Sequence, residues 1–108
     1  RATLNHYQQN WTPPPRRGFL SSRSAVAEFG GGAPCALVGE RINPTGKKQY
    51  TEELRSGKTA YIRREANAQV AAGAVLLDVN CGAPGVDEAE ALERAVYAAS
   101  GASSAPLV

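Results

Sequence analysis

The chain has 108 residues, of which 43% are hydrophobic and 20% are charged, a composition typical of a globular protein with at most one ordinary domain. Its formal net charge of +2 and the dispersal of its twelve Lys and Arg residues exclude the concentrated basic surface that nucleic-acid binding requires. No apolar run approaches the roughly 20 residues of a membrane span, and the first residues lack the apolar core of a secretory signal, so we expect a cytoplasmic protein with no membrane partner.

Residues 1–32 show little periodicity. They contain a run of prolines at residues 13–15 and end in a run of glycines at residues 30–32. Consecutive prolines favour extended polyproline geometry, so residues 1–32 are predicted to be an interdomain linker, in which residues 19–29 could lie on a domain surface. Because the chain begins with Arg and ends in strand-like residues, we expect it to be part of a longer protein.

After the glycines, short apolar runs alternate with amphipathic stretches. We expect buried strands at residues 35–38, at 74–80 and from 106 onward. We expect helices at residues 47–55, at 59–73 with Thr59 as the N-cap, and at 87–101. Strands that alternate with helices predict a parallel α/β sheet, either open or closed into a barrel.

Polar residues follow the first two predicted strands. Glu40 and Asn43 follow the first strand, and Asp78 and Asn80 lie at the end of the second. In parallel α/β folds, ligands bind beyond the carboxyl ends of the strands, so these carboxylates and amides could converge on a ring that carries both donors and acceptors. The alternative is structural: these residues cap strand ends, and Asp78, if buried, could pair with Arg41.

Nucleophilic catalysis and metal binding find little support in the sequence. The only histidine, His6, lies in the predicted linker, so no Ser/His/Asp or Cys/His system can be assembled. Cys35 and Cys81 lack the paired spacing of a zinc site, and we expect both to be reduced thiols.

Two motifs carry a family resemblance. V-G-E-R-I-N-P-T-G-K-K at residues 38–48, followed by L-D-V-N-C-G-A-P-G-V-D-E at residues 77–88, closely resembles the start of pterin-binding methyltransferase domains. The likeness runs from about residue 35 to residue 108. Less closely, F-L-S-S-R at residues 19–23 resembles the linker that joins the homocysteine-binding and folate domains of cobalamin-dependent methionine synthases.

The resemblance implies that residues 33–108 are the first βαβαβ portion of a TIM-type (β/α)8 barrel, which takes about 250 residues when complete. The mouth of such a barrel holds 5-methyltetrahydrofolate, whose methyl group passes to cob(I)alamin on another domain for methionine synthesis from homocysteine. The implied partners are therefore a homocysteine-binding domain, which carries zinc, and a cobalamin-binding domain. A truncated barrel exposes apolar faces, so weak independent stability is expected.

The resemblance also implies roles for residues. Glu40 matches the acid of the family's G-E-R motif, which helps to position the pterin, and Asn43, Thr45 and Gly46 would line the site. Asp78 and Asn80 complete the candidate pterin-binding set. Other pterin contacts of the family would lie beyond Val108, so no catalytic residue is assigned within this chain, and the chain alone is expected to be inactive.

Three alternatives remain open. A methyltetrahydrofolate:corrinoid protein methyltransferase shares both loops, and only the linker likeness argues against it. Dihydropteroate synthase is similar in fold, but its first loop usually reads N-x-T-P-D-S, which residues 43–46 do not reproduce. The third alternative is a non-catalytic α/β interaction module in which both loops are caps.

Overall fold

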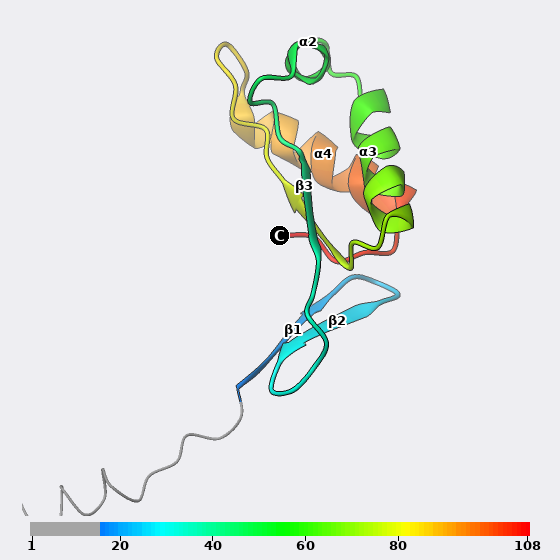
Figure 1. Ribbon diagram of the computed structural model, residues 1–108. Helices are drawn as coiled ribbons and strands as arrows, with labels where there is room; N and C mark the ends of the chain where they lie inside the picture. Colours follow the sequence, from blue (N-terminus) through cyan, green and yellow to red (C-terminus); the bar gives the residue numbers. More distant parts are fainter. Residues whose placement is uncertain (1–15) are drawn as a thin grey trace, which may run out of the picture.

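The computed structural model describes residues 16–108, which form a β-hairpin followed by a mixed α/β unit with three helices (Figure 1). The first part of the predicted linker, residues 1–15, therefore lies outside the described residues. In chain order the elements are β1 (Arg17–Ser21), β2 (Val26–Gly30), β3 (Val38–Ile42), α2 (Lys48–Ser56), α3 (Ala60–Ala71), β4 (Leu76–Val79) and α4 (Glu88–Ala102).

The hairpin occupies the second half of the predicted linker. β1 and β2 pair antiparallel, from Arg17 opposite Gly30 to Ser21 opposite Val26. Ser22 closes the turn, because its hydroxyl accepts a hydrogen bond from the backbone N–H of Ala25 at 3.0 Å. The same hydroxyl donates to the carbonyl oxygen of Ser104 at 2.6 Å. The hairpin is thereby tied to the C-terminal segment of the α/β unit.

A parallel ladder forms the centre of the α/β unit. β3 pairs with β4, and Leu107 forms a parallel bridge with Leu77 of β4. The N–H of Leu77 donates to Pro106 O at 3.0 Å, and the N–H of Val108 donates to Leu77 O at 2.9 Å. β4 thus has parallel neighbours on both sides. This arrangement confirms the expected α/β class and the position of the third strand.

The first strand lies later in the chain than predicted. Residues 35–38 were expected to be a buried strand, but Cys35 is exposed, and the ladder begins only at Val38 because β4 offers its first partner at Leu76. The polar sequence Gly39-Glu40-Arg41 lies within β3. The ladder accommodates it by an irregularity between Gly39 and Ile42, where two residues of β3 face one residue of β4.

The core lies between the ladder and the helices. Its most buried large side chains include Ile42 of β3, Leu77 of β4, Tyr50 of α2 and Ile62 of α3. The buried face of α4 consists of small residues, namely Ala91, Ala95, Ala98 and Ala99. Small side chains allow helices to approach closely, and α4 packs against α3 and β4.

The helices have close to their predicted bounds, and Thr59 occupies the predicted N-cap position of α3, but its side chain makes no cap hydrogen bond. Instead, a carboxylate oxygen of Glu53 in α2 accepts a hydrogen bond at 2.8 Å from the backbone N–H of Tyr61 in the first turn of α3. The start of α3 is therefore capped by the preceding helix. α4 is capped by the residue that directly precedes it, because the side chain of Asp87 accepts a hydrogen bond from the N–H of Glu90 at 3.2 Å.

Several large apolar side chains remain exposed. In the α/β unit they lie in or next to the strand segments and on α4, and they are Leu37, Val38, Val75, Leu92, Val96, Tyr97 and Val108. Exposed apolar side chains of this kind are suited to contacts with further protein segments. Within residues 16–108, no helix combines the length and apolar character needed to cross a membrane.

Candidate functional site

The two motif loops meet at the carboxyl end of the parallel ladder. The loop after β3 leads into α2, and the loop after β4 leads into α4 (Figure 1). They are joined directly, because the N–H of Asn80 donates to the carbonyl oxygen of Ile42 at 2.8 Å. Both loops lie at the end of the ladder remote from the hairpin. The structure therefore brings Asn43 and Asn80 to neighbouring strand ends.

Both asparagines use their side-chain oxygens locally. Asn43 Oδ1 accepts from the N–H of Thr45 at 3.0 Å, and Asn80 Oδ1 accepts from the N–H of Gly82 at 2.9 Å. A backbone N–H can only donate, so the amide atom that faces it is oxygen in each case. Within the part of the chain that the structure describes, the NH2 group of each asparagine, a double donor, therefore remains available to another partner.

The two carboxylates lie across the ladder from each other. Glu40 belongs to the irregular part of β3, between the pairs Gly39–Leu77 and Ile42–Val79, and Asp78 is the β4 residue in the same interval. The Glu40 residue is exposed and Asp78 is half-buried. Both are therefore accessible to a ligand at this end of the ladder.

The suggested pairing of Asp78 with Arg41 is wrong. Nε of Arg41 lies 2.9 Å from a carboxylate oxygen of Glu65 on α3, and Arg64 approaches the other oxygen at 3.6 Å. The Glu65 side chain is largely buried, so its charge needs these partners. Among residues 16–108, Asp78 forms no ion pair.

The remaining predicted residues shape the first loop. Thr45 and Gly46 are exposed in the turn before α2. Gly46 has φ +69°, a backbone conformation that side chains with a Cβ rarely adopt. Next to it, Nζ of Lys47 donates to the carbonyl oxygen of Arg41 at 2.8 Å. The lysine thus secures the loop to the end of β3.

Sequence reasoning missed two tyrosines behind the loops. The rings of Tyr50 and Tyr61 are stacked, with centroids 4.6 Å apart and an interplanar angle of 13°. The Tyr50 hydroxyl donates to Asn80 O at 3.0 Å, and the Tyr61 hydroxyl donates to Arg41 O at 3.2 Å. The available signal was an aromatic residue on the buried face of each of two consecutive helices.

Burial keeps the Tyr50 and Cys81 side chains protonated. Desolvation raises the pKa of Tyr50 far above its ordinary value, and the contact with Cys81 raises it further. Desolvation also raises the pKa of the Cys81 thiol, although the hydrogen bond with Tyr50 opposes this shift. A buried, protonated thiol is a poor nucleophile. Cys81 therefore acts as a core residue.

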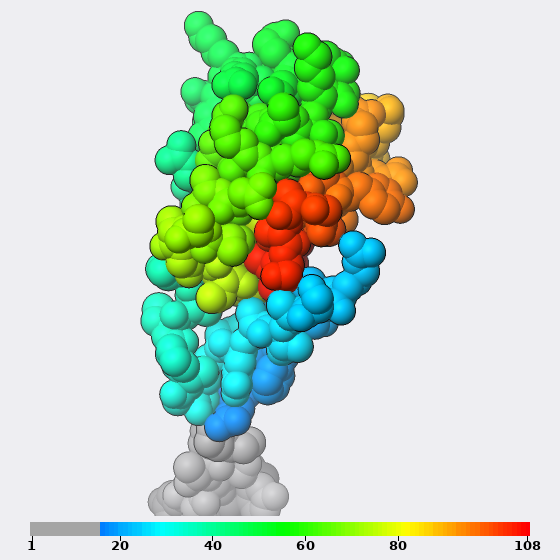
Figure 2. Space-filling model, turned by 90° about the vertical axis from the view of Figure 1, so that its right-hand side faces the viewer, coloured from blue at the N-terminus to red at the C-terminus, as the bar shows by residue number. Residues whose placement is uncertain are grey.

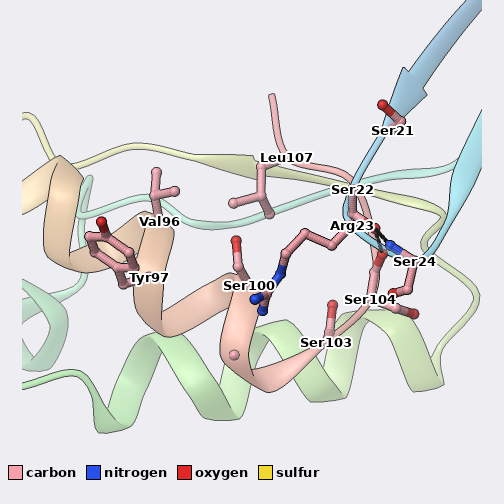
Figure 3. A pocket seen from close by; sticks show the side chains of 11 residues that line it. Ser21, Ser22, Arg23, Ser24, Val96, Tyr97, Ser100, Ser103, Ser104 and Leu107 are labelled. Carbon is pink, nitrogen blue, oxygen red and sulfur yellow. Dashed lines mark hydrogen bonds between the residues drawn. The ribbon is translucent and has the colours of Figure 1, made fainter.

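A hollow among the described residues lies elsewhere. It has a volume of about 610 Å³ and separates the hairpin tip from the C-terminal end of α4 (Figures 2 and 3). Arg23 reaches across it toward Ser100 (Figure 3). A cation near a helix C-terminus is favourable, and α4 has no basic residue of its own in its last turn. The six predicted site residues are not among the residues that line this hollow.

The described residues offer no cluster of side chains for a metal site. Residues 16–108 contain no group of three His, Cys, Asp or Glu side chains that could hold a metal ion. In comparisons with known proteins, no protein-family model and no curated protein matches the chain.

Proposed function

We propose that this chain is the first part of a pterin-binding barrel in a cobalamin-dependent methyltransferase of the methionine synthase type, which takes the methyl group of 5-methyltetrahydrofolate. The observation that carries the proposal is the position of the two motif loops. They follow neighbouring parallel strands and are joined by the hydrogen bond from Asn80 N to Ile42 O. Ligands of parallel α/β folds bind at this end of the strands.

The order of the strands supports a barrel. β4 has β3 on one side and the Leu107 segment on the other, so three successive strand segments lie side by side in chain order. A (β/α)8 barrel adds each new strand next to the preceding one, whereas an open doubly wound sheet reverses its order at a switch point.

The free polar groups suit a pterin. The pterin ring carries an amino group and a ring N–H as donors, and a carbonyl oxygen and ring nitrogens as acceptors. The NH2 groups of Asn43 and Asn80 can donate to its acceptors, and the carboxylates of Glu40 and Asp78 can accept from its donors.

The chemistry of methyl transfer also suits these residues. The leaving group is a tertiary amine, which departs poorly unless it is protonated or strongly hydrogen-bonded, so the site needs polar groups and no covalent nucleophile. Cobalamin, on another domain, would supply the nucleophile for the methyl group. The residues of this chain would bind and orient the pterin.

The test is calorimetric titration of 5-methyltetrahydrofolate into a polypeptide that continues this chain through a complete barrel. Glu40→Gln removes an accepting charge and should weaken binding about tenfold or more, the effect of one lost charge-assisted hydrogen bond. Glu93→Gln is the matched control, because Glu93 is exposed on α4 and forms no ion pair within residues 16–108. It should leave the affinity unchanged. If the folded protein bound no folate, the proposed function would be wrong, and only an α/β scaffold of unknown function would remain.

A further inference from the structure

A stacked pair of tyrosines, one on α2 and one on α3, connects the two loops. Tyr50 is fully buried, and its ring lies on that of Tyr61. The two hydroxyls point to different strand ends: one donates to Asn80 O after β4, and the other donates to Arg41 O within β3. A rigid aromatic stack therefore spans the distance between the two strand ends.

Asn80 is held by three hydrogen bonds. Its N–H donates to Ile42 O at 2.8 Å, its carbonyl oxygen accepts from Tyr50 at 3.0 Å, and its side-chain oxygen accepts from Gly82 N at 2.9 Å. Only the side-chain NH2 group has no partner among residues 16–108. The direction in which this group points depends on the peptide that follows Asn80, and Tyr50 is the residue that fixes the carbonyl of that peptide.

We propose that Tyr50 is a positioning residue, whose hydroxyl holds the Asn80 turn so that the Asn80 NH2 group is presented to the pterin. This inference rests on the proposed function for the identity of the ligand. The role of Tyr50 in fixing the turn follows from the intramolecular contacts alone. Tyr50 does not touch the ligand and acts through Asn80.

The substitution Tyr50→Phe isolates the hydroxyl. It removes the hydrogen bond to Asn80 O and the 3.5 Å contact with Cys81 Sγ, while the ring remains to fill the core and stack on Tyr61. The peptide between Asn80 and Cys81 then loses its buried partner and can rotate. Tyr97→Phe is the matched control, because the Tyr97 side chain is exposed on α4.

The first measurement is amide hydrogen exchange over residues 80–82 in the full-length protein, without ligand. Tyr50→Phe should accelerate exchange of the Gly82 N–H about five- to tenfold, the effect of one lost hydrogen bond on local opening. Tyr97→Phe should leave it unchanged. Unchanged exchange in Tyr50→Phe would overturn the proposal.

The second measurement is a double-mutant cycle on the affinity for 5-methyltetrahydrofolate. Tyr50→Phe and Asn80→Ala should each weaken binding about five- to tenfold, and the double variant should be no weaker than Asn80→Ala alone. An equal further loss in the double variant would overturn action through Asn80. If the wild-type protein binds no folate while Tyr50→Phe still accelerates exchange, the proposed function fails, and Tyr50 keeps its role in fixing the turn.

Discussion

The side-chain oxygen of Gln69 accepts a hydrogen bond from the backbone N–H of Arg41 at 2.8 Å, so a helix residue completes the hydrogen bonding of an irregular strand. Two residues of β3 face one residue of β4 at this point, which leaves the Arg41 N–H without a partner in the ladder. Gln69 is buried, and its amide nitrogen donates to Glu65 O at 3.2 Å within α3. This contact allows the G-E-R sequence to adopt its bulged conformation next to the candidate site.

Gln69→Leu tests this contact. Leucine fills a similar volume but cannot accept a hydrogen bond, so the partly buried N–H of Arg41 is left unsatisfied. We expect a loss of about 1–3 kcal/mol in the free energy of unfolding, measured with urea. Gln49→Leu, at an exposed position on α2, is the control and should change stability by less than about 0.5 kcal/mol. Equal effects of the two substitutions would show that Gln69 does not support β3.

Gly39→Ala tests the close approach of α3 to β3. A Cβ at Gly39 would lie 2.6 Å from Oε1 of Gln69 and 2.9 Å from Cδ2 of Leu77, closer than such atoms pack. We expect about 1–3 kcal/mol of destabilisation in urea unfolding, because a well-packed core must shift to admit the methyl group. Gly101→Ala is the opposite case. Its Cβ would meet nothing within 4 Å in α4, and it should stabilise by up to about 1 kcal/mol.

The order of elements could be predicted because apolar periodicity reflects burial directly. The alternation of strands and helices from Val38 onward follows the predicted plan. The position of β3 could not be predicted, since it depends on where β4 supplies partners and on a bulge completed by Gln69. These are contacts between residues distant in sequence, and they cannot be predicted from a short polar run such as Gly39-Glu40-Arg41. The hairpin was missed for a related reason, because its register and its contact with Ser104 are tertiary.

The candidate site shows the same division. The placement of Asn43 and Asn80 at adjacent strand ends followed from the rule for parallel strands, whereas Glu40 lies inside β3 and Asp78 inside β4. The residues behind them could not be deduced in the same way. Tyr50 lies on a helical face whose sequence pattern predicts only a core position. The residue that its hydroxyl binds is 30 residues away in the chain.

Glu53→Ala tests the cap that α2 provides for α3. The Glu53 carboxylate accepts from the N–H of Tyr61 at 2.8 Å, a bond that the predicted cap Thr59 does not make. An N-terminal cap contributes about 1 kcal/mol, so we expect Glu53→Ala to lower the unfolding free energy by about that amount. Thr59→Ala should cost less than Glu53→Ala in the same urea titration. A larger loss of stability in Thr59→Ala than in Glu53→Ala would indicate that the Thr59 side chain caps α3, and it would contradict the structure.

The buried hydroxyl and thiol also predict how stability depends on pH. The ordinary pKa values of cysteine and tyrosine are 9.0 and 10.0, and burial raises the pKa of both Cys81 and Tyr50 in the folded state. Above about pH 9 the unfolded chain therefore loses protons that the folded chain keeps. The unfolded state then binds fewer protons, so the free energy of unfolding falls as pH rises.

Cys81→Ala isolates the thiol's share of this fall. At pH 7 the variant should be less stable than the wild type, because the substitution removes a buried sulfur atom that packs against Tyr50. Above about pH 9 the difference should shrink, since only the wild type loses thiol-linked stability, at up to about 1.4 kcal/mol per pH unit. Urea unfolding at a series of pH values measures both curves, with the exposed Cys35→Ala as the control that should follow the wild type. A constant difference between wild type and Cys81→Ala would mean that the Cys81 thiol titrates alike in the folded and unfolded chains.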